Sequence, residues 1–410
     1  MTRSRIGGSF ILLTAVLCTA HVRADDWPEF RGPQGNGVST SKNLPSKWSS
    51  SENVAWSKRL PGKGWSSPSI RDGKIYLTAA VRKSQIELQV LCLDGKTGDD
   101  LWSTTVFKHR SSRIHGKNSN ASPTPLVYGG RVYVHFGHQG TACLDIKGKV
   151  IWKNRRIKYS PVHGNGGSPI LTDKAMVFSV DGASQAFVVA LDRKTGKRIW
   201  KTSRKSKAPR KFSFTTPLLI DVNGKKQIVS PGSNVVCSYD ANTGEELWRV
   251  VYDGYSVIPR PIFAHGLVYL ATGYGKPVVY AIRPDGRGDV TRSHVEWTEG
   301  KGAPHTPSLL IVGNELYMVS DRGVASCLDA KTGKVHWQKR IGGGFSTSPV
   351  YADGKIFLQS EKGVGTVLAA SKTFEKLGTN DIGERTLASY AIADDAIFIR
   401  SMTKLYRIEK

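Results

Sequence analysis

The ten residues LDAKTGKVHW, at positions 328–337, decide the fold because the chain repeats their pattern. It recurs as LDGKTGDDLW (93–102), LDRKTGKRIW (191–200) and YDANTGEELW (239–248). Tryptophans close such stretches at positions 102, 152, 200, 248, 297 and 337, at steps of 40 to 50 residues. A period of this size indicates a repeat architecture in which each unit is one supersecondary structure.

Each unit begins with a Pro preceded by a short polar residue or, once, by an arginine. The pairs are Ser67-Pro68, Thr124-Pro125, Ser168-Pro169, Thr216-Pro217, Arg260-Pro261, Thr306-Pro307 and Ser348-Pro349. Apolar runs then alternate with turns at a period of two. The unit from 305 to 340, for example, predicts strands at about 305–312, 315–320, 324–329 and 334–340. Four-stranded units repeated many times predict an all-β propeller.

The number of blades follows from the two ends of the chain. Six units end in tryptophan, and a seventh (344–385) has Phe374 near the expected tryptophan position. Residues 387–410 supply three strands of a last unit, and residues 52–62, with Trp56, supply a lone fourth strand. We therefore expect an eight-bladed β-propeller of four-stranded antiparallel blades over residues 54–410. The N-terminal strand joins the C-terminal blade, which removes the open sheet edges.

The repeated motif itself is expected to have a structural role and not a catalytic one. Its Thr-Gly pair suits a tight turn in which glycine takes a positive φ. A buried indole removes about 150–250 Å² from water, worth roughly 4–6 kcal/mol gross, so one tryptophan per blade would hold neighbouring blades together. The structural tryptophans are Trp56, Trp102, Trp152, Trp200, Trp248, Trp297 and Trp337. We expect Cys92, Cys143, Cys237 and Cys327 to share one small, buried third-strand position, without disulfides between blades.

The first 24 residues have the layout of a signal peptide. Arg3 and Arg5 precede an apolar run, and Val22 and Ala24 suit cleavage after Ala24. We predict a periplasmic or secreted protein with an N-terminal extension at 25–53. The mature chain has no run of 18 apolar residues and is not expected to span a membrane. Cleavage removes three arginines and leaves 56 Lys and Arg against 33 Asp and Glu, a balance of +23 that favours anionic partners.

The motif D-x-x-T-G-x-x-x-W resembles the tryptophan-docking repeat of pyrroloquinoline-quinone (PQQ)-type propellers. It stands at Asp94–Trp102, Asp192–Trp200, Asp240–Trp248 and Asp329–Trp337. Two families share it: the PQQ-dependent alcohol dehydrogenases, and the non-catalytic propeller of the bacterial outer-membrane β-barrel assembly machinery. The stretches WPEFRGPQGNGVS (27–39) and YVHFGHQGTACLD (133–145) also resemble exported PQQ-repeat proteins of planctomycete-type bacteria.

The resemblance to the dehydrogenases implies PQQ in a central funnel, with calcium, a catalytic Asp and usually a disulfide of adjacent cysteines. This chain has no adjacent cysteines, and its motifs assign no Asp to catalysis. We therefore predict a binding or scaffolding module with no cofactor and no metal site. The alternative is a PQQ-dependent alcohol or sugar dehydrogenase with PQQ and calcium. A glycan-active propeller is a third hypothesis.

A site is expected where the second-to-third strand loops and the blade connections share one face. Three connections there are rich in Lys, Arg and His: 107–120, 153–167 and 201–214. They suit solvated surface loops, recognition of an anionic glycan, lipid headgroup or protein partner, or a cofactor funnel in which Asp181, Asp321 and Glu361 hold calcium. No nucleic-acid-binding motif occurs. The candidate ligand-binding residues are His115, His163, Asn165, Arg260, His305, Asp321, Arg322 and Arg400.

Overall fold

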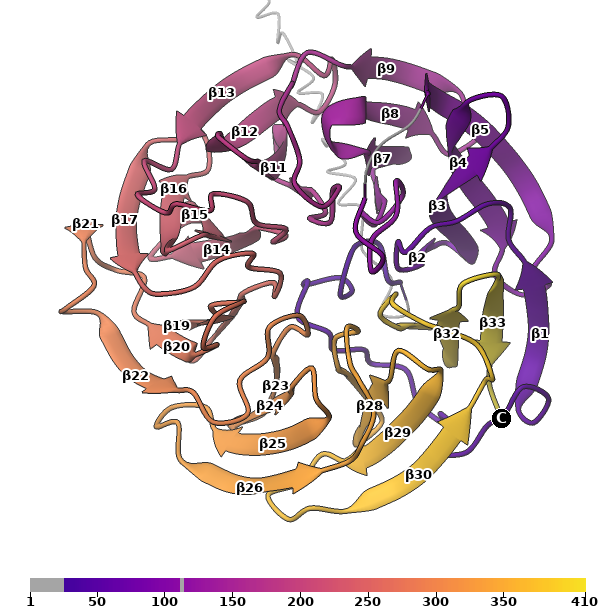
Figure 1. The fold of residues 1–410 in the computed structure, drawn as a ribbon. Helices are drawn as coiled ribbons and strands as arrows, with labels where there is room; N and C mark the ends of the chain where they lie inside the picture. The colour runs from indigo at the N-terminus through magenta and orange to yellow at the C-terminus, as the bar shows by residue number, and fades with distance from the viewer. Residues whose placement is uncertain (1–25, 111–113) are drawn as a thin grey trace, which may run out of the picture.

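The computed structural model describes residues 26–110 and 114–410 and confirms an eight-bladed β-propeller (Figure 1). Eight antiparallel sheets surround a central axis, and each has its first strand innermost and its fourth strand on the rim. The predicted signal peptide lies outside the described residues. Within them, no helix is long and apolar enough to cross a membrane.

Seven blades are continuous in sequence, and each has four strands in the order in which the chain forms them. Blades 1 to 3 comprise β2 (Ser69–Arg71), β3 (Lys74–Arg82), β4 (Ile86–Asp94) and β5 (Asp100–His109); β6 (Leu126–Tyr128), β7 (Arg131–His135), β8 (Thr141–Asp145) and β9 (Val150–Asn154); and β10 (Ile170–Leu171), β11 (Ala175–Asp181), β12 (Ala186–Asp192) and β13 (Arg198–Ser203). Blades 4 and 5 comprise β14 (Leu218–Val222), β15 (Lys225–Gly232), β16 (Val235–Asp240) and β17 (Glu246–Val251), with the short β21 (Gly288–Asp289) added at the rim; and β18 (Ile262–Ala264), β19 (Leu267–Ala271), β20 (Val279–Ile282) and β22 (Val295–Glu299). Blades 6 and 7 comprise β23 (Leu310–Val312), β24 (Glu315–Val319), β25 (Val324–Asp329) and β26 (Val335–Arg340); and β27 (Val350–Ala352), β28 (Lys355–Gln359), β29 (Val364–Ala369) and β30 (Lys376–Asp381).

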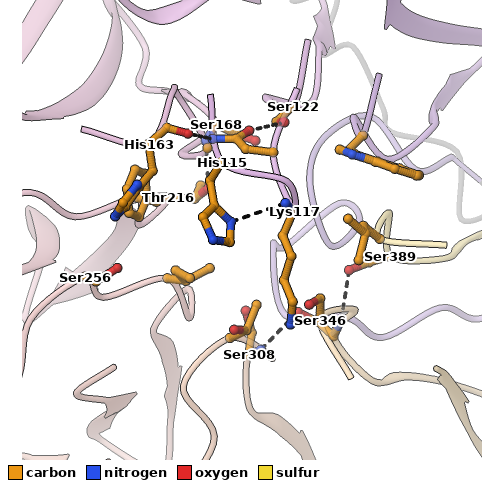
Figure 2. Close-up of a pocket in the computed structure, with 18 of the residues that line it drawn as sticks. His115, Lys117, Ser122, His163, Ser168, Thr216, Ser256, Ser308, Ser346 and Ser389 are labelled. Carbon is orange, nitrogen blue, oxygen red and sulfur yellow. Dashed lines mark hydrogen bonds between the residues drawn. The ribbon is translucent and has the colours of Figure 1, made fainter. Parts of the chain in front are cut away.

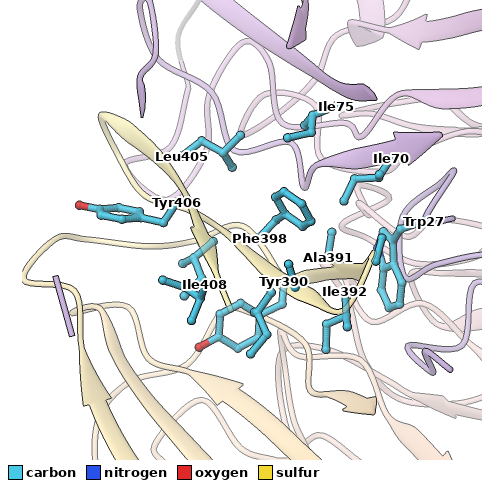
Figure 3. Packing of buried hydrophobic residues seen from close by; sticks show 14 of the residues in the cluster. Trp27, Ile70, Ile75, Tyr390, Ala391, Ile392, Phe398, Leu405, Tyr406 and Ile408 are labelled. Carbon is cyan, nitrogen blue, oxygen red and sulfur yellow. The ribbon is translucent and has the colours of Figure 1, made fainter. Parts of the chain in front are cut away.

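Blade 8 joins the two ends of the chain, as predicted. Its inner three strands are β31 (Ala391–Ala393), β32 (Ala396–Arg400) and β33 (Lys404–Ile408), and β1 (Val54–Arg59) completes it. β1 runs antiparallel to β33, with Trp56 opposite Arg407. Figure 3 shows the apolar core at this closure, where Phe398 of blade 8 lies close to Ile70 and Ile75 of blade 1. Because no blade edge is left open here, the ring is closed by backbone hydrogen bonds as well as by apolar packing.

The repeated motif joins each blade to its neighbour. In blade 6, the Asp329 carboxylate accepts hydrogen bonds from the N–H groups of Lys331 and Thr332 at 3.1 and 2.8 Å, which fixes the turn. Gly333 takes a φ of +73° and lies against the Trp297 ring of blade 5 so closely that a Cβ would come within 2.8 Å of it. The Trp297 Nε1 group donates to the Ala330 carbonyl at 3.0 Å. The tryptophan of one blade therefore packs on the Asp-Thr-Gly turn of the next.

Blade 7 lacks a tryptophan, and the N-terminal extension supplies one. The position opposite Val367, where other blades place tryptophan, is occupied by Gly378. Trp48 packs there against Phe357, with ring centroids 6.2 Å apart, and its backbone N–H donates to Asn380 Oδ1 at 2.8 Å. Phe374, which the sequence places near this position, does not occupy it. Its ring instead packs edge-to-face with the Trp337 ring of blade 6, with centroids 5.2 Å apart.

The four described cysteines are buried and free, as expected, but they do not share one position. Cys92, Cys143 and Cys327 each lie opposite their blade's tryptophan. In blade 4, Ser238 lies opposite Trp248, and Cys237 is one residue earlier in the strand. Because successive side chains of a strand point to opposite faces, Cys237 faces the other neighbouring blade. The Ser238 hydroxyl instead donates to Gln227, which also accepts the Trp248 indole N–H.

Candidate functional site

The hub of the propeller contains a ring of hydroxyl groups. One residue precedes the innermost strand of each blade, and in seven blades it is a serine or threonine. At six blade junctions the hydroxyl oxygen accepts the backbone N–H of the equivalent residue in the preceding blade, at 2.9 to 3.0 Å. We call these residues the hydroxyl ring: Ser67, Thr124, Ser168, Thr216, Ser308, Ser348 and Ser389. Each of these side chains is at most 5% exposed.

Two blades show that, in the Ser-Pro or Thr-Pro pair that begins a unit, the hydroxyl and not the proline makes the hydrogen bond between blades. In blade 6 the Thr306-Pro307 pair lies two residues early, and Ser308 provides the hydroxyl to the ring. In blade 8 Ser389 is followed by Tyr390 instead of proline and still accepts the Ser348 N–H at 2.9 Å. Blade 5 has Arg260 at this position, so the ring lacks a hydroxyl there.

A cavity of about 480 Å³ lies directly on the hydroxyl ring, and all seven ring residues line it. Its walls come from the connections between blades, which carry His115, His163 and Phe212, and from Tyr274 in the β19–β20 loop. Figure 2 shows the opening, with His115 and His163 on one side and Ser346 and Ser389 on the other. A volume in this range holds a small organic ligand, for which pockets are typically roughly 300–1,000 Å³.

Six aromatic side chains, five from blade connections and Tyr274 from the β19–β20 loop, form a continuous arc around the mouth of this cavity. The arc comprises His115, His163, Phe212, Tyr255, Tyr274 and His305. Neighbouring ring centroids lie 5.3, 5.2, 6.0, 6.3 and 4.9 Å apart in this order. Such spacing is that of packed aromatic pairs, so the arc is a preformed surface rather than a set of independent side chains.

Two cations complete the mouth. Lys117 extends across the cavity from the β5–β6 connection (Figure 2), and its Nζ reaches Glu361 Oε1 of the β28–β29 loop at 2.6 Å. Ser346 donates to the same carboxylate oxygen at 2.6 Å. The Arg210 guanidinium lies over the Tyr255 ring at 4.7 Å. Among the described residues that line the cavity there is no Asp or Glu, although Glu361, just outside the lining, offsets the charge of Lys117.

The N-terminal segment, residues 26–48, closes the far end of the hub. Figure 1 shows this indigo segment crossing the centre of the ring. Phe30 lines the cavity from below, and Arg31 is 1% exposed. The Asp26 carboxylate accepts the Asp72 N–H at 3.0 Å in a turn on the face opposite the mouth. The segment makes polar contacts with six blades, through Ile70, Val127, Arg260, Leu309, Pro349 and Ile392.

The structure places some of the predicted site residues at the cavity. His115 and His163 line it. His305 and Asp321 lie at its rim, where the Asp321 carboxylate accepts the His305 N–H at 2.7 Å. Burial alone would raise the pKa of Asp321, but the hydrogen bonds from His305 and Thr306 outweigh it and lower the pKa.

The other predicted site residues lie away from the cavity. Asn165 lies behind it and accepts a hydrogen bond from Tyr159, and Arg322 is on an exposed turn. Arg260 is buried at the closed end, where it pairs with Glu29 at 2.8 Å. Arg400 is buried between blades 8 and 1, where it donates to Ser66 and Thr78, and burial lowers its pKa to about 9.

The sequence interpretation missed Lys117, Arg210, Phe212, Tyr255 and Tyr274. It read the connection 201–214 as a run of charge and did not weigh the aromatic residues within it. The signal available was the interleaving of basic and aromatic residues in PRKFSF (209–214).

The carboxylates that were considered for calcium do not come together. Asp181 is buried and binds the Arg204 guanidinium at 2.8 Å, and burial raises its pKa. Asp321 caps the loop at His305, and Glu361 is paired with Lys117. No group of three or more His, Cys, Asp or Glu side chains suitable for a metal ion occurs among residues 26–110 and 114–410. The residues present therefore do not fit a calcium-bound quinone.

Comparison with known proteins gives a family and a fold. The PQQ-type repeat model described as outer membrane protein assembly factor BamB matches residues 38–184, 184–288 and 276–381. No curated protein matches the chain. Among solved structures, the quinohemoprotein alcohol dehydrogenase from Comamonas testosteroni has a TM-score of 0.71 at 12% identity, covering 95% of this chain and 81% of that one. BamB from Moraxella catarrhalis has a TM-score of 0.64 at 12% identity, covering 87% of this chain and 97% of that one. A europium-containing methanol dehydrogenase has a TM-score of 0.72 at 11% identity, covering 95% of this chain and 98% of that one. At these identities the likeness is one of fold.

Proposed function

Because the chain belongs to the PQQ-type repeat family of the assembly factor BamB, we propose that it is an exported binding module that holds an anionic ligand in its central funnel. The observation that carries this proposal is the cavity at the hub, which has Lys117 and Arg210 at its mouth and no carboxylate in its lining. Recessed cations attract anions over several ångströms, and the cavity desolvates an anion on entry, which strengthens each charged contact.

Binding of three anions of different chemistry tests this proposal. Inorganic polyphosphate, phosphatidylglycerol vesicles and polygalacturonate are titrated into the protein at low and high salt. The variant carrying Lys117→Ala and Arg210→Ala should lose at least tenfold in affinity for the anion that binds, because it removes both mouth cations. The matched control carries Lys225→Ala and Lys331→Ala, which remove the same charge from exposed turns on the opposite face. Equal loss in both variants would show that only net charge matters.

Export through residues 1–24 is part of the proposal. The net charge, the buried free cysteines and the family are all compatible with it, and its direct test is N-terminal sequencing of the protein recovered outside the cytoplasm. The expected first residue is Asp25. A chain that begins at Met1 in that fraction would contradict cleavage after Ala24.

A second candidate function is a PQQ-dependent dehydrogenase, favoured by Lys117 and Arg210 at the cavity mouth, which suit a flat ligand with three carboxylates. The same cavity lacks carboxylate ligands for calcium, so we derive no oxidation step. Adding PQQ and calcium, followed by gel filtration, would detect retained quinone by its absorbance, and a dye-linked assay would detect alcohol oxidation. Retained quinone with turnover would replace the binding module by an enzyme.

A further inference from the structure

We infer that the ligand is the terminal unit of an acidic saccharide, inserted end-on into the hub. This inference rests on the proposed anion-binding function and names its chemical class: a uronic acid, which combines a carboxylate with a ring of hydroxyl groups. Three independent features of the cavity lead to it: unused hydrogen-bond donors at its base, an aromatic wall, and a closed far end.

The hydroxyl ring provides donors that the fold itself does not use. A serine or threonine hydroxyl has one proton to donate and can accept on its oxygen. At six junctions the oxygen is already occupied by the N–H of the preceding blade, and no ring hydroxyl donates to another described residue. Their protons are therefore available to whatever fills the cavity. A circle of buried donors suits a ligand rich in oxygen, because hydroxyl and carboxylate oxygens both accept.

The aromatic arc provides a complementary wall. The face of an aromatic ring carries negative charge density and attracts the weakly positive C–H groups of another molecule. A pyranose ring has such C–H groups on its faces and hydroxyls around its edge. Because the Phe212 and Tyr255 rings stand at 86° to each other, the sugar would stack on the face of one of them and present its edge to the hydroxyl ring. A phosphate or a simple inorganic anion has no apolar face and would leave this wall uncovered.

Lys117 and Arg210 fit the carboxylate of such a sugar. The Lys117 ammonium is 2.6 Å from the Glu361 carboxylate, so it already binds a carboxylate at the mouth, and an incoming uronate would compete with Glu361 for it. The Arg210 guanidinium is positioned over Tyr255, next to the stacking surface, and guanidinium groups bind carboxylates through two parallel hydrogen bonds.

The closed end limits the ligand to a chain terminus. Phe30 forms the base of the cavity, and the buried segment around Arg31 contacts the inner strands beyond it. A polymer therefore cannot thread through the propeller along its axis. Only one end of a saccharide chain enters the cavity, and the rest of the chain extends outward from the mouth between the basic connections.

Calorimetry with matched oligosaccharides tests the ligand class. Tetragalacturonate should bind the protein with a stoichiometry of one and at least tenfold more tightly than neutral maltotetraose at low salt. If polyphosphate or phosphatidylglycerol vesicles bind at the mouth cations while tetragalacturonate does not, this inference is overturned and the proposed function stands. If none of the anions binds, both fall.

Substitution of single hydroxyls tests the role of the ring. Ser67→Ala removes one cavity-facing donor and keeps the Ser67 N–H bond to Thr124, so affinity for tetragalacturonate should fall on the order of five- to tenfold with an unchanged melting temperature. Ser69→Ala is the matched control, since the Ser69 hydroxyl donates to Pro125 between blades and does not line the cavity. Equal affinities for the two variants would overturn the role of the ring.

Length dependence tests end-on binding. Long polygalacturonates of defined length should saturate with the same number of protein molecules per polymer, whatever the length, because each polymer has the same number of ends. A number that increases with polymer length would show binding along the chain and overturn the end-on geometry.

Discussion

The rim and the hub of this propeller use the same eightfold repeat in opposite ways. On the rim, four docking tryptophans donate their indole N–H to a carbonyl of the next blade, so their polar atoms are consumed by the fold. At the hub, hydroxyl oxygens accept an N–H from the preceding blade and keep their protons for the cavity. The rim residues therefore have a structural role alone, whereas the hub hydroxyls both connect neighbouring blades and keep hydrogen-bond donors for a ligand.

Removing the Trp48 side chain should give the largest loss of stability. It tests whether the N-terminal extension is part of the rim. Trp48 is 3% exposed and takes the tryptophan position of blade 7. We expect Trp48→Ala to cost roughly 3–5 kcal/mol of unfolding free energy, as for other buried tryptophans. Urea unfolding measures it, with Trp337→Ala as the comparison within a regular blade. A loss below about 1 kcal/mol for Trp48→Ala alone would show that blade 7 is stable without this residue.

A smaller loss of stability is expected from a substitution that removes both the junction acceptor and the cavity donor of one ring hydroxyl. Thr216→Val keeps the shape of the side chain but removes the acceptor of the Ser168 N–H, which lies at 2.9 Å. An unsatisfied buried donor costs about 1–3 kcal/mol, so urea unfolding should show that loss. Ser67→Ala should leave stability unchanged, since its oxygen accepts no N–H among the described residues. Equal stability of the two variants would contradict the junction role of the ring.

The contrast between rim and hub also explains which parts of the structure could be predicted from the sequence alone. The rim was predictable because its Asp, Thr-Gly and tryptophan residues recur at fixed spacing, and even the joining of Trp56 to the last blade follows from counting strands. Trp48 was missed because it replaces a repeat element from outside the repeat. The cavity was only half predicted: His115 and His163 were named, whereas Phe212 and Tyr255 occur in connections that have no common pattern. Their convergence is set by the ring geometry, which brings distant segments to one axis.

The smallest effect on stability concerns the turn aspartates of the rim, which titrate, whereas the hydroxyls of the ring do not. Hydrogen bonds from the Thr332 side chain and from the backbone lower the pKa of Asp329 below its ordinary value, despite opposing burial. The stabilisation that results is therefore present above the unfolded-state pKa of about 4 and is lost as pH falls through the folded-state value.

Asp329→Asn keeps an oxygen acceptor for the turn and removes the titrating group. We expect it to lower stability at pH 7 by less than about 1 kcal/mol, because the site is partly solvated. Below pH 4 the gap between the variant and the parent should narrow, since the parent loses its charge there. Thermal unfolding measured from pH 7 down to pH 3 follows this gap. A gap that stays constant over that range would mean that the Asp329 charge contributes nothing to the turn, and that the rim depends on its packing alone.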